Sequence, residues 1–224
     1  MGKLIFITGT DTDVGKTYIT GLIGRSLLAR DKNVITMKPL QTGSSGISED
    51  IITHRKIMGI DLHRFDLDGI TNPYNFPFPA SPHLSARISK VEIDIKKIKN
   101  NISHLSKNFD YVIIEGAGGL IVPITGKYTI VDLISDLRLP VIVVTTPKIG
   151  TLNHTFLSLE FLKNRKVDVL SVIYNNYTNK EDEITLDNIM TMKYFYPEIP
   201  FIETKDIERV VDIIEKDNRL LFQF

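Results

Sequence analysis

Residues 9–17 read Gly-Thr-Asp-Thr-Asp-Val-Gly-Lys-Thr and follow an apolar run, Leu4 to Thr8, that has the length of a β-strand. The residues after them carry apolar side chains at helical spacing. A turn of this kind between a buried strand and a helix is the setting of a phosphate-binding loop, in which backbone N–H groups and the positive end of the helix hold phosphates. The stretch therefore predicts a nucleotide site, with Lys16 at the terminal phosphates and the Thr17 hydroxyl as a ligand of Mg²⁺.

The spacing of this loop departs from the common pattern. Gly9 and Gly15 enclose five residues where four are usual, and Thr10 stands in the place of the first glycine. The alternative interpretation is a tight strand-to-helix turn that carries an exposed lysine. The strand–turn–helix setting favours the phosphate-binding loop over that alternative.

Six apolar runs of strand length recur along the chain, with helical stretches between them. They are rich in Ile and Val and lack polar alternation, as expected for strands buried on both faces of a mostly parallel sheet. The repeated βα units predict an α/β fold with a doubly wound, mostly parallel sheet and helices on both faces, of the P-loop NTPase type. Ligands of such sheets bind beyond the carboxyl ends of the strands. The predicted strands are Leu4 to Thr8, Asn33 to Met37, Tyr111 to Ile114, Val141 to Thr145, Val169 to Tyr174, and Ile199 to Ile202.

The composition sets limits on the partners of the protein. The 224 residues show no repeat, so we expect one domain over residues 1–224. No apolar run approaches the ~20 residues of a bilayer span, so no membrane association is expected. Lys plus Arg equals Asp plus Glu, 27 against 27, so no global field attracts nucleic acid. The chain has no cysteine, which excludes disulfides and thiolate metal sites and favours a cytoplasmic location.

Two stretches interrupt the βα pattern. Phe65 to Pro82 contains four prolines, which disfavours both a helix and a central strand and predicts an ordered loop or cap. Gly116 to Lys127 begins with three glycines in its first four residues, directly after a buried strand. Glycines at such a place indicate that the backbone closely approaches another group.

A carboxylate, Glu115, leaves the predicted strand Tyr111 to Ile114 just before those glycines. A carboxylate at the end of a central strand, beside a phosphate-binding loop, is placed to hold Mg²⁺ directly or through water. The alternative is an acidic side chain in a solvated turn. The combination with the phosphate-binding loop favours the metal ligand.

Lys38 ends the second predicted strand, and Pro39 turns the chain out of the sheet, which aims Lys38 and Thr42 over the strand ends. A second cation there would offset the repulsion between two anions that must react, which is several kcal/mol at roughly 4 Å in a partly dry site. The alternative is an ordinary surface lysine at a strand end.

Asp50 lies in the first turn of a predicted helix that Ser48 is suited to cap. An acidic residue in a first turn usually complements the helix dipole. His54 follows four residues later, and the two side chains have the spacing of a metal-binding pair. Neither a third ligand nor a His-Glu-x-x-His pattern accompanies them, so we do not expect a metal site built on this pair.

These motifs together resemble the dethiobiotin synthetase family, and the resemblance covers most of the chain. The phosphate-binding loop is similar to that of the family, including its five-residue spacing. Thr42 takes the place of a serine common in the family and keeps the hydroxyl. The further matching motifs are Lys38-Pro39 with Thr42-Gly43, Asn72-Pro73-Tyr74 leading to Ser81-Pro82-His83, Glu115-Gly116-Ala117-Gly118-Gly119, Gly150 with Asn153-His154, and Asn175.

The resemblance implies an ATP-dependent cyclo-ligase of biotin biosynthesis. Its substrates would be 7,8-diaminopelargonate, carbon dioxide or bicarbonate, and ATP with Mg²⁺. One amine forms a carbamate, the carbamate oxygen attacks the γ-phosphate, and the second amine closes the ring of dethiobiotin with release of phosphate. By position, Lys16 and Lys38 would be the catalytic residues, while Thr17, Asp50 and Glu115 would hold the metal.

The resemblance also assigns the remaining contacts. Thr12 and Thr42 would contact the diamine or its carbamate, and Asn175 would contact adenine. Family members are homodimers whose substrate tail reaches the neighbouring subunit, here at a helix that begins near Leu152 and offers free N–H groups to a carboxylate. The residues assigned to the substrate tail are Gly150, Thr151, Leu152 and Asn153. The residues assigned to ATP are Thr12, Asp13, Val14, Gly15, Lys16, Thr17, Asp50, Glu115, Gly116, Ala117, Gly118, Asn175, Asn176, Pro200, Phe201 and Ile202.

Three other functions share part of this pattern. A P-loop ATPase switch of the partitioning or nitrogenase-iron-protein kind has the same fold, but usually carries an additional lysine early in the loop, where this chain has Thr10 and Asp11. A small-molecule kinase would leave the phosphate on its substrate. A non-catalytic nucleotide-binding module would show no change of turnover when Lys38 is replaced.

Overall fold

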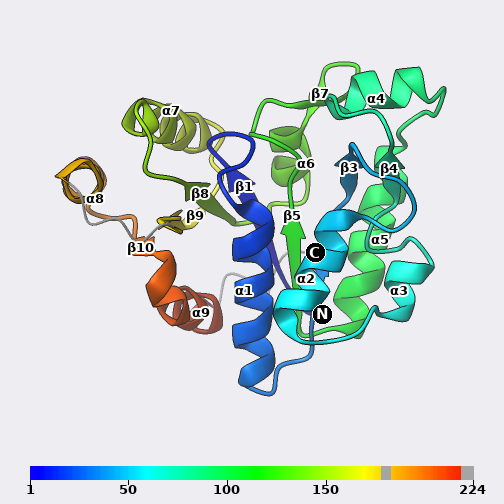
Figure 1. Cartoon of the computed structure of the whole chain (residues 1–224), viewed down its shortest axis with the longest axis horizontal. Coiled ribbons are helices and arrows are strands. Elements are labelled where there is room, and N and C mark those ends of the chain that lie inside the picture. The colour runs from blue at the N-terminus through cyan, green and yellow to red at the C-terminus, as the bar shows by residue number, and fades with distance from the viewer. Residues whose placement is uncertain (178–182, 218–224) are drawn as a thin grey trace.

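The computed structural model describes residues 1–177 and 183–217. The strands of its main sheet are β1 (Lys3–Gly9), β2 (Val34–Met37), β5 (Tyr111–Glu115), β8 (Val141–Thr145), β9 (Val169–Tyr174) and β10 (Phe201–Glu203). They lie in the order β10-β9-β8-β1-β5-β2, and all neighbours are parallel (Figure 1). The six predicted runs are these six strands. The last strand begins at Phe201, two residues later than the predicted Ile199, because Pro200 has no N–H to donate to a ladder.

Helices cover both faces of this sheet, which confirms the doubly wound α/β fold. One layer contains α1 (Lys16–Ala29) and α9 (Ile207–Lys216), and the other contains α5 (Ile95–Asn108), α6 (Ile130–Asp136), α7 (Thr151–Asn164) and α8 (Glu183–Phe195). Alternation along β1 explains the two layers. Ile5 and Ile7 pack with the α1 layer, whereas Leu4 and Phe6 pack with the α5 layer, and all four side chains are fully buried. Each such side chain contributes roughly 1.5–3 kcal/mol of hydrophobic stabilisation.

The position of β1 in the sheet determines where a ligand can bind. Strands β5 and β2 lie on one side of β1, and β8, β9 and β10 lie on the other. The strand order therefore reverses at β1, and in open α/β sheets the crevice at such a point, outside the carboxyl ends, is the usual ligand site. The residues that leave β1, β2, β5 and β8 meet at this edge.

Two small sheets lie outside the main one. Strands β3 (Leu40–Thr42) and β4 (Tyr74–Phe76) form a parallel pair, and β6 (Pro123–Thr125) and β7 (Tyr128–Thr129) form an antiparallel pair. The departure of β3 from the main sheet agrees with the turn expected at Pro39.

The proline-rich segment is partly different from its prediction. It contains no strand of the main sheet, as expected, but its first residues belong to the short helix α3 (Arg64–Leu67), so the exclusion of a helix is wrong there. A capping box explains this helix, because His63 Nδ1 accepts from the N–H of Phe65 and Asp66 accepts from the N–H of His63. The prolines begin only afterwards, and Pro82 opens α4 (Pro82–Ile88) at a position that suits proline.

Helix α2 (Glu49–Met58) runs beside α1 and carries two side chains of the site (Figure 1). Its N-cap is Ser48, as predicted, whose hydroxyl accepts from the N–H of Ile51 at 3.3 Å. The helix ends at Met58, and its C-cap, Gly59, has a φ of 72°.

A buried ion pair joins α2 to α3. The guanidinium of Arg55 donates to both carboxylate oxygens of Asp66 at 2.8 and 2.7 Å, and also to the hydroxyl of Thr36 on β2 at 2.6 Å. The Asp66 carboxylate further accepts from the Thr71 hydroxyl at 2.6 Å. The side chains of the pair are 3% and 0% exposed, so water does not reach them and each charge is compensated mainly by the other.

Among residues 1–177 and 183–217, no helix combines the length and apolarity needed to cross a membrane.

Candidate active site

The predicted phosphate-binding loop connects β1 to α1 at the crevice. Its last residue, Gly15, is the N-cap of α1 and has a φ of 94°, which favours glycine. A Cβ at Gly15 would lie 2.0 Å from Nδ2 of Asn175, which in turn donates to the carbonyl of Val14 at 2.9 Å. Glycine thus allows the end of β9 to hold the loop closely, and the N-terminal N–H groups of α1 remain directed into the crevice.

Lys16 is the first residue of α1, and its side chain is buried in the site. Its ammonium donates to the main-chain carbonyl of Asp11 at 2.9 Å, within the same loop. Burial lowers the pKa of Lys16 to about 8, and the nearby ammonium of Lys38 lowers it further against the opposing effect of Glu115. Because burial and Lys38 disfavour the charged form of Lys16, a bound anion would stabilise that charged form.

The lowered pKa predicts a pH dependence of nucleotide binding. Bound phosphates favour the charged form of Lys16 and raise its pKa. Below pH 8 the lysine is protonated with or without nucleotide, so the affinity does not change; above it, the free protein loses the proton and must regain it on binding. We expect the dissociation constant of ATP to rise by up to about tenfold per pH unit above this value. Calorimetry at pH 7 and pH 9 in two buffers of different ionisation enthalpy measures the proton uptake. Equal affinities and no uptake at pH 9 would contradict the expectation.

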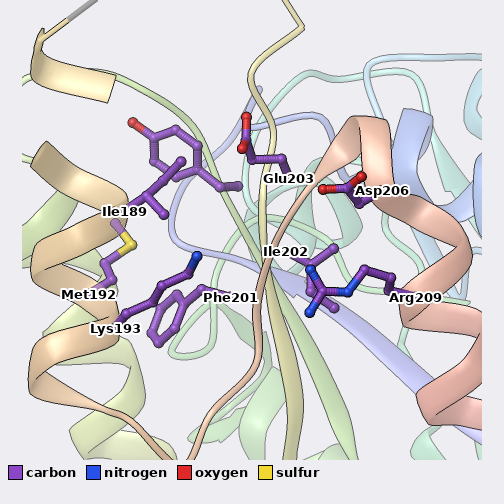
Figure 2. Close-up of a pocket in the computed structure, with 9 residues that line it drawn as sticks. Ile189, Met192, Lys193, Phe201, Ile202, Glu203, Asp206 and Arg209 are labelled. Carbon is purple, nitrogen blue, oxygen red and sulfur yellow. The ribbon is translucent and has the colours of Figure 1, made fainter. Parts of the chain in front are cut away.

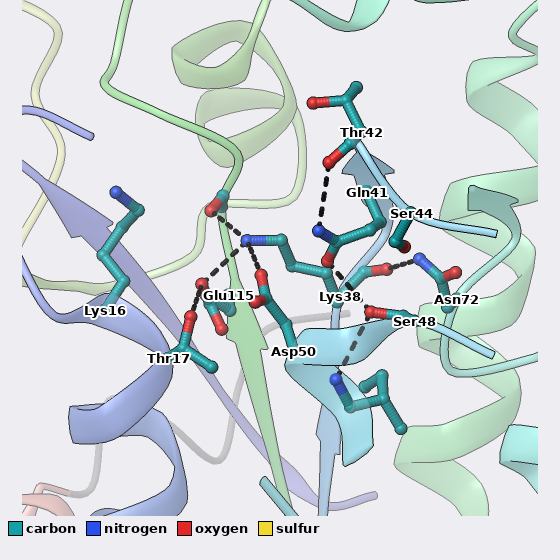
Figure 3. A network of polar contacts seen from close by, with 12 residues as sticks. Lys16, Thr17, Lys38, Gln41, Thr42, Ser44, Ser48, Asp50, Asn72 and Glu115 are labelled. Atoms are coloured by element: carbon teal, nitrogen blue, oxygen red, sulfur yellow. Dashed lines mark hydrogen bonds and ion pairs between the residues drawn. The ribbon is translucent and has the colours of Figure 1, made fainter. Parts of the chain in front are cut away.

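Lys38 leaves β2 and reaches the centre of the site, where three oxygens surround its ammonium (Figure 3). It contacts Oδ2 of Asp50 and Oε1 of Glu115, both at 2.7 Å, and donates to the carbonyl of Gly116 at 3.1 Å. Burial by itself would lower the pKa of Lys38, but the two carboxylates outweigh burial and raise it. Lys38 is therefore a permanent cation in this site rather than a surface lysine.

Glu115 is 1% exposed and has partners for both carboxylate oxygens. Oε1 accepts from the Thr17 hydroxyl at 2.9 Å as well as from Lys38, and Oε2 lies 2.7 Å from Nε2 of His54. Burial would raise the pKa of Glu115, but Lys38 and His54 lower it to about 2. The group is thus a buried carboxylate and not part of a solvated turn.

The two predicted catalytic lysines lie in one site. Figure 3 shows their side chains above the strand ends, on either side of Thr17 and Glu115. The effect of Lys38 on the pKa of Lys16 reflects the same proximity.

The three predicted metal ligands also lie together. Thr17 contacts Glu115, and Asp50 and Glu115 share the ammonium of Lys38. Two carboxylates and a hydroxyl form an all-oxygen donor set, and Mg²⁺ prefers one or two carboxylates together with phosphate oxygens and water. These residues therefore fit a magnesium ion that accompanies a nucleotide.

The other residues assigned to the nucleotide lie around this centre. Asp13 and Val14 belong to the loop, and Gly116, Ala117 and Gly118 follow β5. At Gly116 a Cβ would meet the ring of Phe6 at 2.8 Å, and Gly118 has a φ of 67°, so both positions require glycine as predicted for a close backbone approach.

A cleft lies around β10, between α8 and α9 (Figure 2). Of the residues assigned to ATP, Phe201 and Ile202 line this cleft, whereas the carbonyl of Pro200 accepts a sheet hydrogen bond from Val172. Asn175 lies nearby, and its Oδ1 accepts from the Thr204 hydroxyl at 3.0 Å. Asn176 is buried beside it. Sequence reasoning did not single out the polar residues of the cleft, which are Lys193, Glu203, Asp206 and Arg209.

The residues assigned to the substrate come from three segments: the phosphate-binding loop, β3 and the start of α7. Thr12 and Asn153 are exposed, and Thr42 is partly exposed on β3. Gly150 is the N-cap of α7, with a φ of 88°, so this helix begins one residue before the predicted Leu152. The N–H of Thr151 donates to the carbonyl of Lys148 at 3.1 Å, so the N–H groups of Leu152 and Asn153 are the ones that could bind a carboxylate.

Two contacts tie the start of α7 to the phosphate-binding loop. The Thr145 hydroxyl at the end of β8 contacts the hydroxyls of Thr151 and Thr10 at 2.8 and 3.3 Å. Lys148 pairs with Asp11 at 2.7 Å. The hydroxyl of Thr151 is therefore part of the framework, and sequence reasoning missed both links because their partners are distant in the chain.

Known proteins resemble the chain in sequence and in fold. The family model described as an AAA domain matches residues 3–219. An ATP-dependent dethiobiotin synthetase BioD 2 from Pasteurella multocida is 47% identical over 185 residues, which are 83% of this chain and 87% of the relative. The protein of the same name from Haemophilus influenzae is 49% identical over 177 residues, 79% of this chain and 93% of the relative. The ATP-dependent dethiobiotin synthetase BioD of Chlorobaculum tepidum is 41% identical over 207 residues, which are 90% of this chain and 87% of the relative.

Solved structures with the same fold are more distant in sequence. A ParA family ATPase from Chlorobium tepidum has a TM-score of 0.56 at 17% identity and covers 96% of this chain and 93% of its own. The MinD cell division protein of Aquifex aeolicus has a TM-score of 0.55 at 17% identity, with 98% and 97% covered. At this identity the likeness shows the P-loop NTPase fold alone.

Proposed function

The chain belongs to the ATP-dependent dethiobiotin synthetase family, and we propose from this premise that it converts 7,8-diaminopelargonate, carbon dioxide and ATP to dethiobiotin, ADP and phosphate. It is an ATP-dependent ligase that forms carbon–nitrogen bonds in biotin biosynthesis. The supporting observation is the buried ammonium of Lys38, held 2.7 Å from both Asp50 and Glu115 beside the phosphate-binding loop.

The chemistry requires an anion to attack an anion. One amine of the substrate adds to carbon dioxide and loses a proton to give a carbamate. The carbamate oxygen then forms a bond to the γ-phosphorus as the bond to ADP breaks, and the second amine attacks the carbamoyl carbon, expels phosphate and loses a proton. Two unit charges about 4 Å apart at an effective dielectric constant of roughly 20 repel by about 4 kcal/mol. Lys16 and Lys38 offset this repulsion, and their burial strengthens the effect.

We propose the remaining roles from the family resemblance. Thr17, Asp50 and Glu115 hold Mg²⁺, which when bound neutralises the charge of the β- and γ-phosphates. The adenine lies beside Asn175 and Asn176, near the β10 segment of Pro200, Phe201 and Ile202. The loop backbone from Thr12 to Thr17 holds the phosphates.

We further propose a homodimer in which the substrate spans two subunits. Thr12 and Thr42 contact the diamine or carbamate, and the substrate carboxylate binds at Gly150 to Asn153 of the neighbouring subunit, where the N-terminus of α7 offers N–H groups. Such an interface also shields the carbamic–phosphoric anhydride from water.

We also propose that residues 1–224 form one ligase domain, that its partners are small molecules, and that it is located in the cytoplasm.

The direct test is mass spectrometry of the product formed from diaminopelargonate, ATP, Mg²⁺ and ¹³C-labelled bicarbonate. We expect dethiobiotin with one ¹³C atom and one phosphate released for each ring closed. Omission of either the diamine or bicarbonate should stop phosphate release. ATP turnover that ignores both would contradict the ligase and favour an ATPase switch, whereas phosphate found on the diamine would indicate a kinase.

A further inference from the structure

His54 is a fully buried residue of α2 for which the proposed chemistry has no role. It lies one helical turn after Asp50, so the two side chains share a face of the helix. Its Nε2 is 2.7 Å from Oε2 of Glu115. Its Nδ1 is also buried and has no hydrogen-bond partner among residues 1–177 and 183–217. Within the described residues, the imidazole therefore makes a single hydrogen bond, the one to Glu115.

The direction of this hydrogen bond follows from its partner. An ionised carboxylate only accepts, so the hydrogen of the contact belongs to Nε2 of His54. The histidine thus donates a hydrogen bond to Oε2 of Glu115, the oxygen that neither Thr17 nor Lys38 contacts. Asp50 contacts the same lysine from α2, and Lys16 stands across the site.

The contact with His54 fixes which oxygen of Glu115 faces the other groups of the site. With His54 on Oε2, only Oε1 faces Thr17 and Lys38. Without that donor, Oε2 would be buried and unsatisfied, which is more unfavourable for a charged group than for a neutral one. Rotation toward the Lys38 ammonium, which would bring both oxygens to one cation, would then be favoured. A carboxylate committed to the lysine is a weaker ligand for a metal.

We propose that His54 is a positioning residue that holds the Glu115 carboxylate in the orientation required to bind the divalent cation of the metal–nucleotide complex. This role rests on the proposed function, since that function includes the metal-bound nucleotide. It also explains why His54 follows Asp50 at metal-ligand spacing without itself being a ligand: it supports a ligand from the neighbouring strand. Removal of an outer partner of this kind typically lowers metal affinity or activity by about 10–100-fold.

Two substitutions separate positioning from packing. His54→Leu fills a similar volume and cannot donate, whereas the amide of His54→Gln places an N–H near the position of Nε2. His104→Leu, at an exposed histidine, is the control. We expect His54→Leu to bind ADP in EDTA within about twofold of the parent, but to bind Mn²⁺ in the ADP complex roughly 10–100-fold more weakly, measured by electron paramagnetic resonance. His54→Gln should recover most of that affinity.

The binding experiment tests the positioning role of His54 and does not require the diamine substrate. Unchanged Mn²⁺ affinity in His54→Leu would overturn it, as would a His54→Gln variant no better than His54→Leu. Parallel loss of metal-free ADP binding would assign His54 to packing alone. Should the ligase assay fail while the metal effect appears, the proposed function falls and the positioning role stands.

A measurement on the unsubstituted protein does not depend on folding of variants. A long-range ¹H–¹⁵N spectrum of the histidine rings should show His54 with hydrogen on Nε2. A hydrogen on Nδ1 with a bare Nε2 would exclude donation to Glu115 and overturn the proposal.

Discussion

Lys38→Ala is expected to lower kcat by about 10²–10³-fold, the loss typical of one group that stabilises developing charge in a dry site. The ammonium lies between Asp50 and Glu115, so its removal leaves two carboxylates facing the attacking anion. ADP should still bind, because the phosphate-binding loop and Lys16 are separate from this side chain. Diamine-dependent phosphate release measures the rate, and calorimetry measures ADP binding.

The exposed Lys107 offers a matched control for the Lys38 variant, since Lys107→Ala removes one ammonium away from the site. Its kcat should equal that of the parent. A Lys38→Ala protein with unchanged turnover would contradict the role of the lysine and fit a non-catalytic nucleotide-binding module. Thermal unfolding of both variants separates a lost rate from a lost fold.

Arg55→Met is expected to lower the free energy of unfolding by about 3–5 kcal/mol. The substitution leaves the Asp66 carboxylate, whose side chain is 0% exposed, without its bidentate partner. Urea unfolding followed by circular dichroism gives the change. The double variant Arg55→Met with Asp66→Leu removes both charges and should recover much of the loss, because an apolar pair of similar volume often replaces a buried ion pair at little net change.

The exposed pair of Arg64 and Asp68 serves as the comparison for the buried pair. Its atoms approach to 3.2 Å, but the side chains are 85% and 50% exposed. Arg64→Met should therefore change the stability by at most about 1 kcal/mol. If Arg55→Met also lowered the free energy of unfolding by no more than this, water or a rearranged neighbour would have to satisfy the Asp66 carboxylate.

The fold could be predicted from the sequence because its signals are local. Each central strand is a continuous apolar run, and the loop at residues 9–17 stands between a strand and a helix. The short helix α3 was missed because prolines later in its segment dominated the prediction, while the capping residues His63 and Asp66 were overlooked. Local capping outweighed the overall composition of the segment.

The candidate site was predictable to the extent that each residue carries its own signal. Lys38 could be placed because Pro39 marks the strand end, and Glu115 because glycines follow it. The partner of His54 could not be predicted, since the contact joins residues 61 positions apart and depends on how α2 packs against α1 and β2. The same limit applies to the pair of Lys148 and Asp11, 137 positions apart.

The arrangement of two lysines and two carboxylates has a further consequence for selectivity. Lys16 and Lys38 carry two positive charges, and Asp50 and Glu115 carry two negative ones, so the resting centre is close to electroneutral. Its potential consequently decays within a short distance, and free phosphate or chloride gains little by approaching. Retention of an anion then depends on shape: a ligand must present its oxygens to the loop N–H groups in the correct order. The protein can thus discriminate between a nucleotide and the abundant small anions around it without excluding either by charge.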